Sequence, residues 1–150
     1  HMRKLRDAIH NGDTCFKHLL SHAWSLEQGE DNGGFHCHLL MIFDGAEHYK
    51  DSYLADQVGQ KWQDITEGVG YCFILNTREY KEGLARRGIL GIGMIHRDNM
   101  QEVENAVNAA LYLTRPDKRD KSYQRLKVSV PNMNTFGQRI SPSKVNDPYN

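Results

Sequence analysis

The pattern of hydrophobic and polar residues in the first third of the chain predicts one helix followed by a β-hairpin. Residues 3–10 carry apolar side chains four positions apart, which is the spacing of a short amphipathic helix, and Asn11-Gly12 should end it. Residues 24–28 alternate apolar and polar side chains, and residues 35–45 form a run of β-forming residues that stops at an Asp-Gly pair. Because the glycine-rich residues 29–34 have the composition of a turn, the two runs predict a hairpin.

The middle and the second half of the chain predict two helices and two further strands. Residues 50–65 carry apolar side chains at helical spacing and predict a core-facing helix. The apolar runs 68–76 and 88–96 predict strands, joined by a polar connection over residues 77–87. Residues 100–115 predict the longest helix, which a proline ends. The order α-β-β-α-β-β-α predicts an antiparallel β-sheet flanked by helices, which is the α+β class.

The length and composition are those of one soluble globular domain. The chain has 150 residues, of which 39% are hydrophobic and 25% charged, and no apolar run approaches the ~18 residues that span a bilayer. We expect a domain over residues 3–137, an irregular basic tail over residues 138–150 and an expression-tag remnant at residues 1–2. An odd number of cysteines without a CxxC pair favours a reducing, cytoplasmic compartment: Cys15, Cys37 and Cys72.

The zero net charge is a cancellation between two parts of the chain. Nineteen basic and 19 acidic side chains balance overall. Residues 27–67 hold nine acidic and two basic side chains, whereas residues 115–150 hold eight basic and three acidic ones. This distribution fits two solvated faces of opposite sign. It also fits a polyanion-binding edge beside an acidic pocket that a metal ion neutralises.

The most informative tripeptide is His36-Cys37-His38. Alternate side chains of a strand share a face, so both imidazoles should project to one side and Cys37 to the other. If the hairpin forms, it places Glu27 on the neighbouring strand, and two imidazoles with one carboxylate suit a divalent cation. Two alternatives are a purely structural HxH pair and a structural zinc site completed by Cys15 or His22.

Tyr112 is the second candidate. On a helical wheel it falls on the polar side of the predicted helix, away from the apolar stripe. Arg115, three residues further on, carries a cation that could stabilise a phenolate or bind a phosphate. The alternative is an ordinary surface tyrosine beside an arginine. Tyr53 and Tyr71 are expected to be packing residues, the first on a helix stripe and the second in a strand.

Taken together, these segments resemble a known enzyme family. WSLEQGEDNGGFHCHLLMIFDG resembles the W-x-x-E and H-x-H segment of HUH endonucleases, in particular the replication initiators of filamentous phages and the YagK/YfjJ-type C-terminal domain of cryptic prophages. YLADQVGQKWQDITEGVGYCF is similar to the helix and T-x-G-x-G segment of that family, and AALYLTRPD to its Y-L-x-K motif. The FG pair at residues 136–137 also has a counterpart, so the resemblance covers about residues 19–137.

The resemblance implies metal-dependent nicking and joining of single-stranded DNA. His36, His38 and Glu27 would hold Mg²⁺ or Mn²⁺, and Tyr112 would form a 5′-phosphotyrosine and release a 3′-OH that primes rolling-circle replication of a phage or mobile element. Arg115 stands where the family usually has lysine. The implied partners are single-stranded DNA or an origin hairpin and a host replication helicase. Phosphate contacts are expected from the basic side chains Arg115, Lys118, Arg119, Lys121, Arg125 and Lys127.

One departure from the family leaves a second function open. HUH folds carry a strand ahead of the first helix, and no such strand precedes Arg3 in this sequence, so either the strand was trimmed away or the protein has lost it. A sheet without that strand would have an unpaired edge. The alternative function is therefore a non-catalytic DNA-binding regulator that retains the HUH fold and binds DNA mainly through the basic residues from Arg115 onward.

Overall fold

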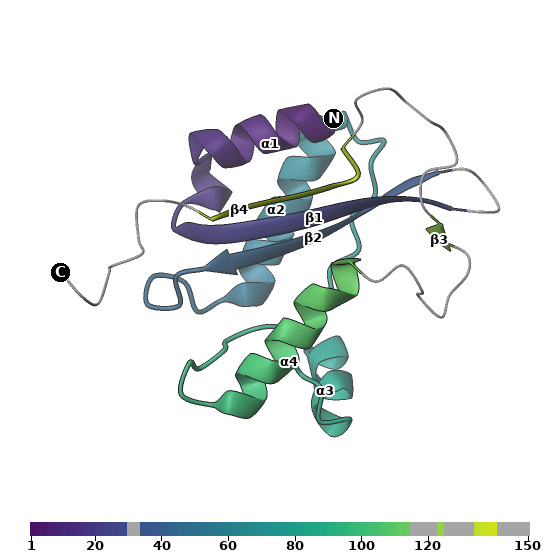
Figure 1. Cartoon of the computed structure of the whole chain (residues 1–150). Coiled ribbons are helices and arrows are strands. Elements are labelled where there is room, and N and C mark those ends of the chain that lie inside the picture. Colours follow the sequence, from purple (N-terminus) through teal and green to yellow (C-terminus); the bar gives the residue numbers. More distant parts are fainter. Residues whose placement is uncertain (30–33, 115–122, 125–133, 141–150) are drawn as a thin grey trace. The chain divides into compact units, whose positions relative to one another are not determined.

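The computed structural model describes residues 1–29, 34–114, 123–124 and 134–140 (Figure 1). Its elements are α1 (Met2–Asn11), η1 (Thr14–Phe16), β1 (Leu19–Gly29), β2 (Phe35–Phe43), α2 (Asp51–Ile65), α3 (Arg78–Arg86), α4 (Met100–Leu111), η2 (Tyr112–Thr114), β3 (Tyr123–Gln124) and β4 (Phe136–Ile140). Helices and an antiparallel sheet are both present, so the α+β class is confirmed. None of the helices formed by these residues is long and apolar enough to cross a membrane.

The chain divides into two compact units, neither of which is continuous in sequence. The first consists of residues 1–19 and 43–106, and the second of residues 20–42 together with the described part of 107–150. The first unit therefore holds α1, η1, α2, α3 and most of α4. The second holds nearly all of the sheet, the last turn of α4 and η2.

The sheet of the second unit is built around β1. β2 is its neighbour on one edge, as the predicted hairpin requires, and β3 pairs antiparallel with its last two residues. β4 also pairs antiparallel with β1, with Ser21 opposite Ile140 and Ser25 opposite Phe136. The buried Trp24 lies opposite Gly137 in this register. A glycine is needed there, because a Cβ atom would lie 2.6 Å from the indole nitrogen.

The first unit packs two short N-terminal elements on α2. α1 and η1 both contact α2, and the buried apolar side chains here are Leu5, Ala8, Phe16 and Ile65. α1 ends as the sequence predicts: Gly12 adopts a left-handed conformation with φ +66°, and its N–H group donates to the carbonyl oxygens of the last turn. The helix predicted over residues 50–65 is confirmed by α2.

The strands predicted over residues 68–76 and 88–96 are wrong. Neither segment belongs to a strand in the described part of the chain. Both lie close to a helix instead: Gly70 fits against the side chains of Trp62 and Thr66 on α2, and Gly91 fits against the main chain of α4. Because a strand is defined by a hydrogen-bonded neighbour, apolar β-forming residues alone do not create one.

The polar connection expected over residues 77–87 contains a helix, α3. Thr77 caps its first turn, because the Thr77 side-chain oxygen accepts a hydrogen bond of 3.3 Å from the Tyr80 N–H group. The helix is tied to the start of α2 by Lys81, whose ammonium group donates 2.9 Å hydrogen bonds to both carboxylate oxygens of Asp51. Asn76 donates a third hydrogen bond to the same carboxylate. Polarity had suggested a loop here, but capping and ion pairing stabilise a helix.

Two boundaries near the C-terminal end also differ from the prediction. α4 ends at Leu111, and Tyr112–Thr114 form a turn of 3-10 helix, so the helix is shorter than the predicted range 100–115. The tail expected to be irregular from residue 138 begins inside β4, since Gln138–Ile140 belong to that strand. A short strand with mixed polarity has little periodic pattern in its sequence, so it is hard to predict. β4 forms because its main chain pairs with β1.

Candidate functional site

The hairpin formed by β1 and β2 places Glu27 and His38 side by side. Glu27 lies on β1, and its Oε2 atom is 3.4 Å from Nε2 of His38 on β2. Both side chains are mostly buried, with 12% and 25% of their surface exposed. A carboxylate and an imidazole nitrogen therefore face each other in a sheltered part of the second unit.

His36 joins this pair through its ring. The imidazole rings of His36 and His38 meet edge to face, with centroids 4.6 Å apart and planes at 74°. The two residues are separated by one position on the same strand, so the pleat of β2 projects both side chains to one face. The structure thus gathers the three residues that the sequence singles out: one carboxylate and two imidazoles.

Tyr112 contacts the same histidine. Its ring meets the ring of His38 edge to face, with centroids 5.9 Å apart and planes at 88°. Tyr112 is the first residue of η2, immediately after α4, and 46% of its surface is exposed. A phenol that contacts an imidazole and remains open to solvent is accessible to a polymeric substrate.

Exposure does not distinguish Tyr112 from the other tyrosines. Tyr53 and Tyr71, expected to be packing residues, are 59% and 81% exposed, so that expectation is wrong. Tyr53 is an exposed residue of α2, and Tyr71 lies in a segment that joins no strand among the residues that the structure describes. The apolar stripe predicted for α4 is also partly open, because Val107 and Leu111 are exposed. Tyr112 differs from these tyrosines in its contact with His38. A helical wheel cannot predict this contact, because it contains no information about other elements of the fold.

The spacing of Glu27 and His38 is compatible with two ligands of one ion. Metal–ligand bonds of ~2.1 Å at tetrahedral or octahedral angles place neighbouring donor atoms about 3.0–3.4 Å apart. The observed 3.4 Å falls at the upper end of this range. Among the described residues, however, no group of three or more His, Cys, Asp or Glu side chains is arranged so that it could hold a metal ion. His36 is the candidate for a third ligand, because its ring contacts that of His38.

The Cys37 thiol, which lies between the two histidines on β2, has a raised pKa. Burial raises the pKa of the Cys37 thiol to about 11, and the nearby charge of Glu27 adds to this increase. The thiol therefore stays protonated at neutral pH. Of the residues in the alternative zinc site, His22 lies on β1, whereas Cys15 belongs to the first unit. Burial likewise raises the pKa of the Cys15 thiol.

The basic residues expected to contact DNA lie outside the described residues. This applies to the six side chains Arg115, Lys118, Arg119, Lys121, Arg125 and Lys127. Arg139 is described: it lies on β4, and its main-chain carbonyl accepts a 3.0 Å hydrogen bond from the Ser21 hydroxyl. Comparison of the chain with protein-family models, with curated proteins and with solved structures finds no match.

Proposed function

We propose that this chain nicks and rejoins single-stranded DNA, with Tyr112 as the nucleophile, and that it initiates rolling-circle replication of a phage or mobile element. The observation that carries the proposal is the contact chain in which the Tyr112 ring touches His38 and His38 touches both His36 and Glu27. All four residues belong to the segments that resemble motifs of HUH endonucleases. The chain's fold would then be a variant of the HUH fold.

The residues divide into a nucleophile and a ligand set. The phenolic oxygen of Tyr112 attacks the scissile phosphorus, a new phosphorus–oxygen bond forms, and the bond to the 3′ oxygen breaks. The phenol loses its proton and the departing oxygen gains one, leaving a 5′-phosphotyrosine and a free 3′-OH. Attack by a 3′-OH in the reverse direction rejoins the strand. Glu27, His36 and His38 would hold Mg²⁺ or Mn²⁺, which when bound supplies charge to polarise a non-bridging phosphate oxygen.

Covalent capture of DNA tests this proposal. The full chain is incubated with a pool of random-sequence single-stranded oligonucleotides and Mn²⁺, and adducts are mapped by peptide mass spectrometry. We expect an adduct on Tyr112 that disappears with EDTA and in Tyr112→Phe. Tyr71→Phe is the matched control, because Tyr71 is an even more exposed tyrosine outside the site, and it should retain the adduct.

The Tyr112→Phe variant separates loss of the nucleophile from loss of the fold. Tyr112→Phe removes one partly exposed hydroxyl, so its free energy of unfolding should change by less than about 1.5 kcal/mol. An adduct that persists in this folded variant, or one mapped to another tyrosine, contradicts the assignment. Binding of the oligonucleotides without any adduct under all metal conditions would favour the non-catalytic DNA-binding regulator.

The ligand set is tested separately by titrating Mn²⁺ into the protein. Glu27→Gln and His36→Ala should each lower the affinity for Mn²⁺ by at least tenfold, because each removes one proposed ligand. Asp64→Asn, on the first unit, changes an acidic residue outside the site and should leave the affinity unchanged. If all these variants bind Mn²⁺ as tightly as the unmodified chain, then Glu27 and His36 are not metal ligands.

A further inference from the structure

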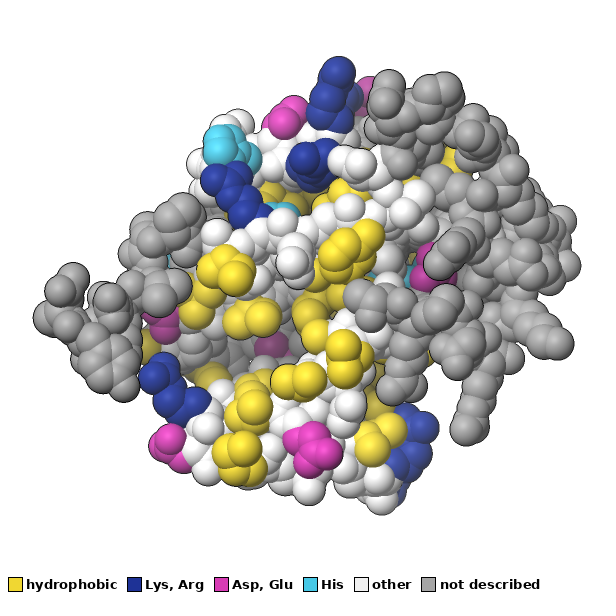
Figure 2. All heavy atoms as spheres, in the orientation of Figure 1, with side chains coloured by type: hydrophobic (Ala, Val, Ile, Leu, Met, Phe, Trp, Pro, Cys, Tyr) yellow, Lys and Arg dark blue, Asp and Glu magenta, His cyan; other side chains and the backbone are white. Residues whose placement is uncertain are grey.

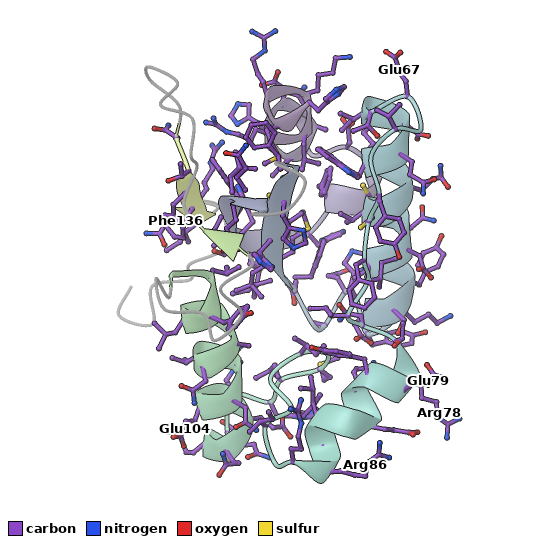
Figure 3. All side chains as sticks on the ribbon, turned by 90° about the vertical axis from the view of Figure 1, so that its right-hand side faces the viewer. Glu67, Arg78, Glu79, Arg86, Glu104 and Phe136 are labelled. Carbon is purple, nitrogen blue, oxygen red and sulfur yellow. The ribbon has the colours of Figure 1, made fainter. Side chains whose placement is uncertain are left out.

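Residues 68–76 form an extended segment that runs back along α2. Figure 3 shows Glu67 at one end of α2 and Arg78 near the other end, with this segment connecting them. At its far end the Asn76 carbonyl accepts a hydrogen bond from the Ser52 hydroxyl, at the start of α2. Along the segment, exposed and half-buried residues alternate strictly from Val69 to Asn76. The segment therefore has the side-chain pattern of a β-strand.

One side of the segment packs against α2 through its even-numbered residues. The Gly70 N–H group donates a 3.0 Å hydrogen bond to the Thr66 side chain. Cys72 and Ile74 lie over Gly59, where a Cβ atom would be 3.5 Å from the cysteine sulfur and 3.4 Å from Ile74 Cδ1. This packing fixes which side of the segment faces outward.

The outward side is entirely apolar, and much of it is exposed. Val69 is 83% exposed, Tyr71 81%, Phe73 66% and Leu75 39%. Surface strands usually place polar side chains outward, so four successive outward apolar positions are an inversion of the ordinary pattern. Figure 2 shows that hydrophobic side chains reach the surface in the described part of the chain. A contiguous apolar stripe of this kind marks an interaction surface.

The main chain of the segment is also available for pairing. Within the described residues, no hydrogen bond involves the main-chain groups of Tyr71–Leu75. The segment thus presents unpaired N–H and C=O groups beside its apolar side chains, as an edge strand does. Pairing with another extended segment would satisfy these main-chain groups and place further side chains directly beside those of the stripe.

We propose that residues 69–75 pair antiparallel with the same residues of a second copy of this chain. A twofold axis through Cys72 puts Val69 opposite Leu75 and Tyr71 opposite Phe73, so every outward side chain meets an apolar or aromatic partner. Residues 68–76 contain no charged side chain, so this pairing brings no like charges together. The segment also contains no lysine or arginine that could neutralise a phosphate, which disfavours nucleic acid as its partner.

Sedimentation of the full chain over a range of concentrations tests the association. We expect a reversible dimer, and a Tyr71→Glu, Phe73→Glu double variant should weaken association at least tenfold, because its carboxylates face one another across the pair. The matched control is Tyr49→Glu, Tyr53→Glu, which changes two exposed tyrosines outside the segment and should leave the dimer intact. Circular dichroism of each variant checks that it is folded.

The register is tested by mixing two single-cysteine variants, Val69→Cys and Leu75→Cys. In the proposed pair these positions face each other, so the mixture should form a disulfide-linked dimer. Neither variant alone should do so, because each residue lies roughly 20 Å from its own copy, six residues along the strands. The background replaces the native cysteines by serine: Cys15, Cys37 and Cys72.

Three results would overturn the proposal. The first is a chain that remains monomeric at all concentrations, and the second is equal weakening by the control variant. The third is a monomer whose affinity for single-stranded DNA falls in the Tyr71→Glu, Phe73→Glu variant, which would make the stripe a base-stacking surface. None of these measurements depends on DNA cleavage, so they can contradict the dimer without contradicting the proposed nicking activity.

Discussion

Replacing Gly137 by alanine tests the pairing of β4 with β1. The new Cβ atom would lie 2.6, 2.7 and 2.9 Å from atoms of the Trp24 indole, closer than Cβ atoms approach other atoms in folded proteins. The indole is 6% exposed and belongs to the central strand, so it has little freedom to move away. The substitution therefore has to displace β4, the indole, or both.

The magnitude follows from two opposing effects. Overpacking of this kind costs about 1–3 kcal/mol. Alanine recovers about 0.5–1 kcal/mol, because it loses less backbone freedom than glycine on folding. Because all three contacts are shorter than 3.0 Å, we expect a cost in the upper part of the overpacking range, about 2–3 kcal/mol. The net destabilisation is then about 1–2.5 kcal/mol, which for a chain of this length lowers the melting temperature by about 2–10 °C.

Tryptophan fluorescence during urea unfolding measures this change. The chain has two tryptophans, one in each unit, so a Trp62→Phe background leaves Trp24 as a reporter of the second unit. The matched control is Gly83→Ala in α3 of the first unit, where a Cβ atom meets nothing within 4 Å, so the unfolding reported by Trp24 should not be destabilised. A Gly137→Ala protein as stable as its parent would refute the close contact between this glycine and Trp24.

Three further predictions concern the packing and the ionisable groups. Gly70→Ala should lower the free energy of unfolding in urea by about 1–3 kcal/mol, because its Cβ atom would lie 2.6 Å from Trp62 and 2.7 Å from Thr66; an unchanged value would contradict this packing. Although burial alone would raise the pKa of the Asp51 carboxyl, hydrogen bonds and the charge of its lysine partner hold that pKa below its ordinary value. The resulting stabilisation is present above pH ~3.9 and is lost as the pH falls through the lower folded-state pKa, so Asp51→Asn should flatten the acid limb of the stability–pH curve. At pH 8 the raised pKa of about 11 should make alkylation of Cys37 about a hundredfold slower than that of an ordinary thiol, measured by peptide mass spectrometry; equally fast alkylation would show that the thiol is not buried.

Local patterns were sufficient for the first half of the fold. α1 and α2 follow from apolar residues at helical spacing, and the capping glycine ends α1 where the sequence places it. The neighbouring strands β1 and β2 follow from two β-forming runs separated by turn residues. In each case the signal lies in residues that are close together in the chain, where the period of the side chains decides which conformation buries the apolar ones.

The candidate site was predictable only in part. That His36 and His38 share a face follows from the period of two in a strand, and that Glu27 lies nearby follows from the hairpin. That Tyr112 reaches His38 does not follow from either, because the end of α4 and the strand β2 are about 70 residues apart in sequence. A helical wheel gives the direction of a side chain about its own helix axis, but it does not show which other element of the fold that side chain contacts.

The remaining differences have one physical cause. The apolar run over residues 68–76 predicts an extended segment, and the structure has one, in which exposed and half-buried residues alternate. Whether such a segment joins a sheet depends on a hydrogen-bonding partner elsewhere in the chain, and here α2 occupies its inner side. The converse holds for β4, whose mixed sequence predicts no strand but whose main chain pairs with β1. Sequence alone determined α1, α2 and the neighbouring strands β1 and β2, whereas the other partners, and with them the burial of residues such as Tyr71, rested on long-range packing and main-chain hydrogen bonds that only the tertiary structure provides.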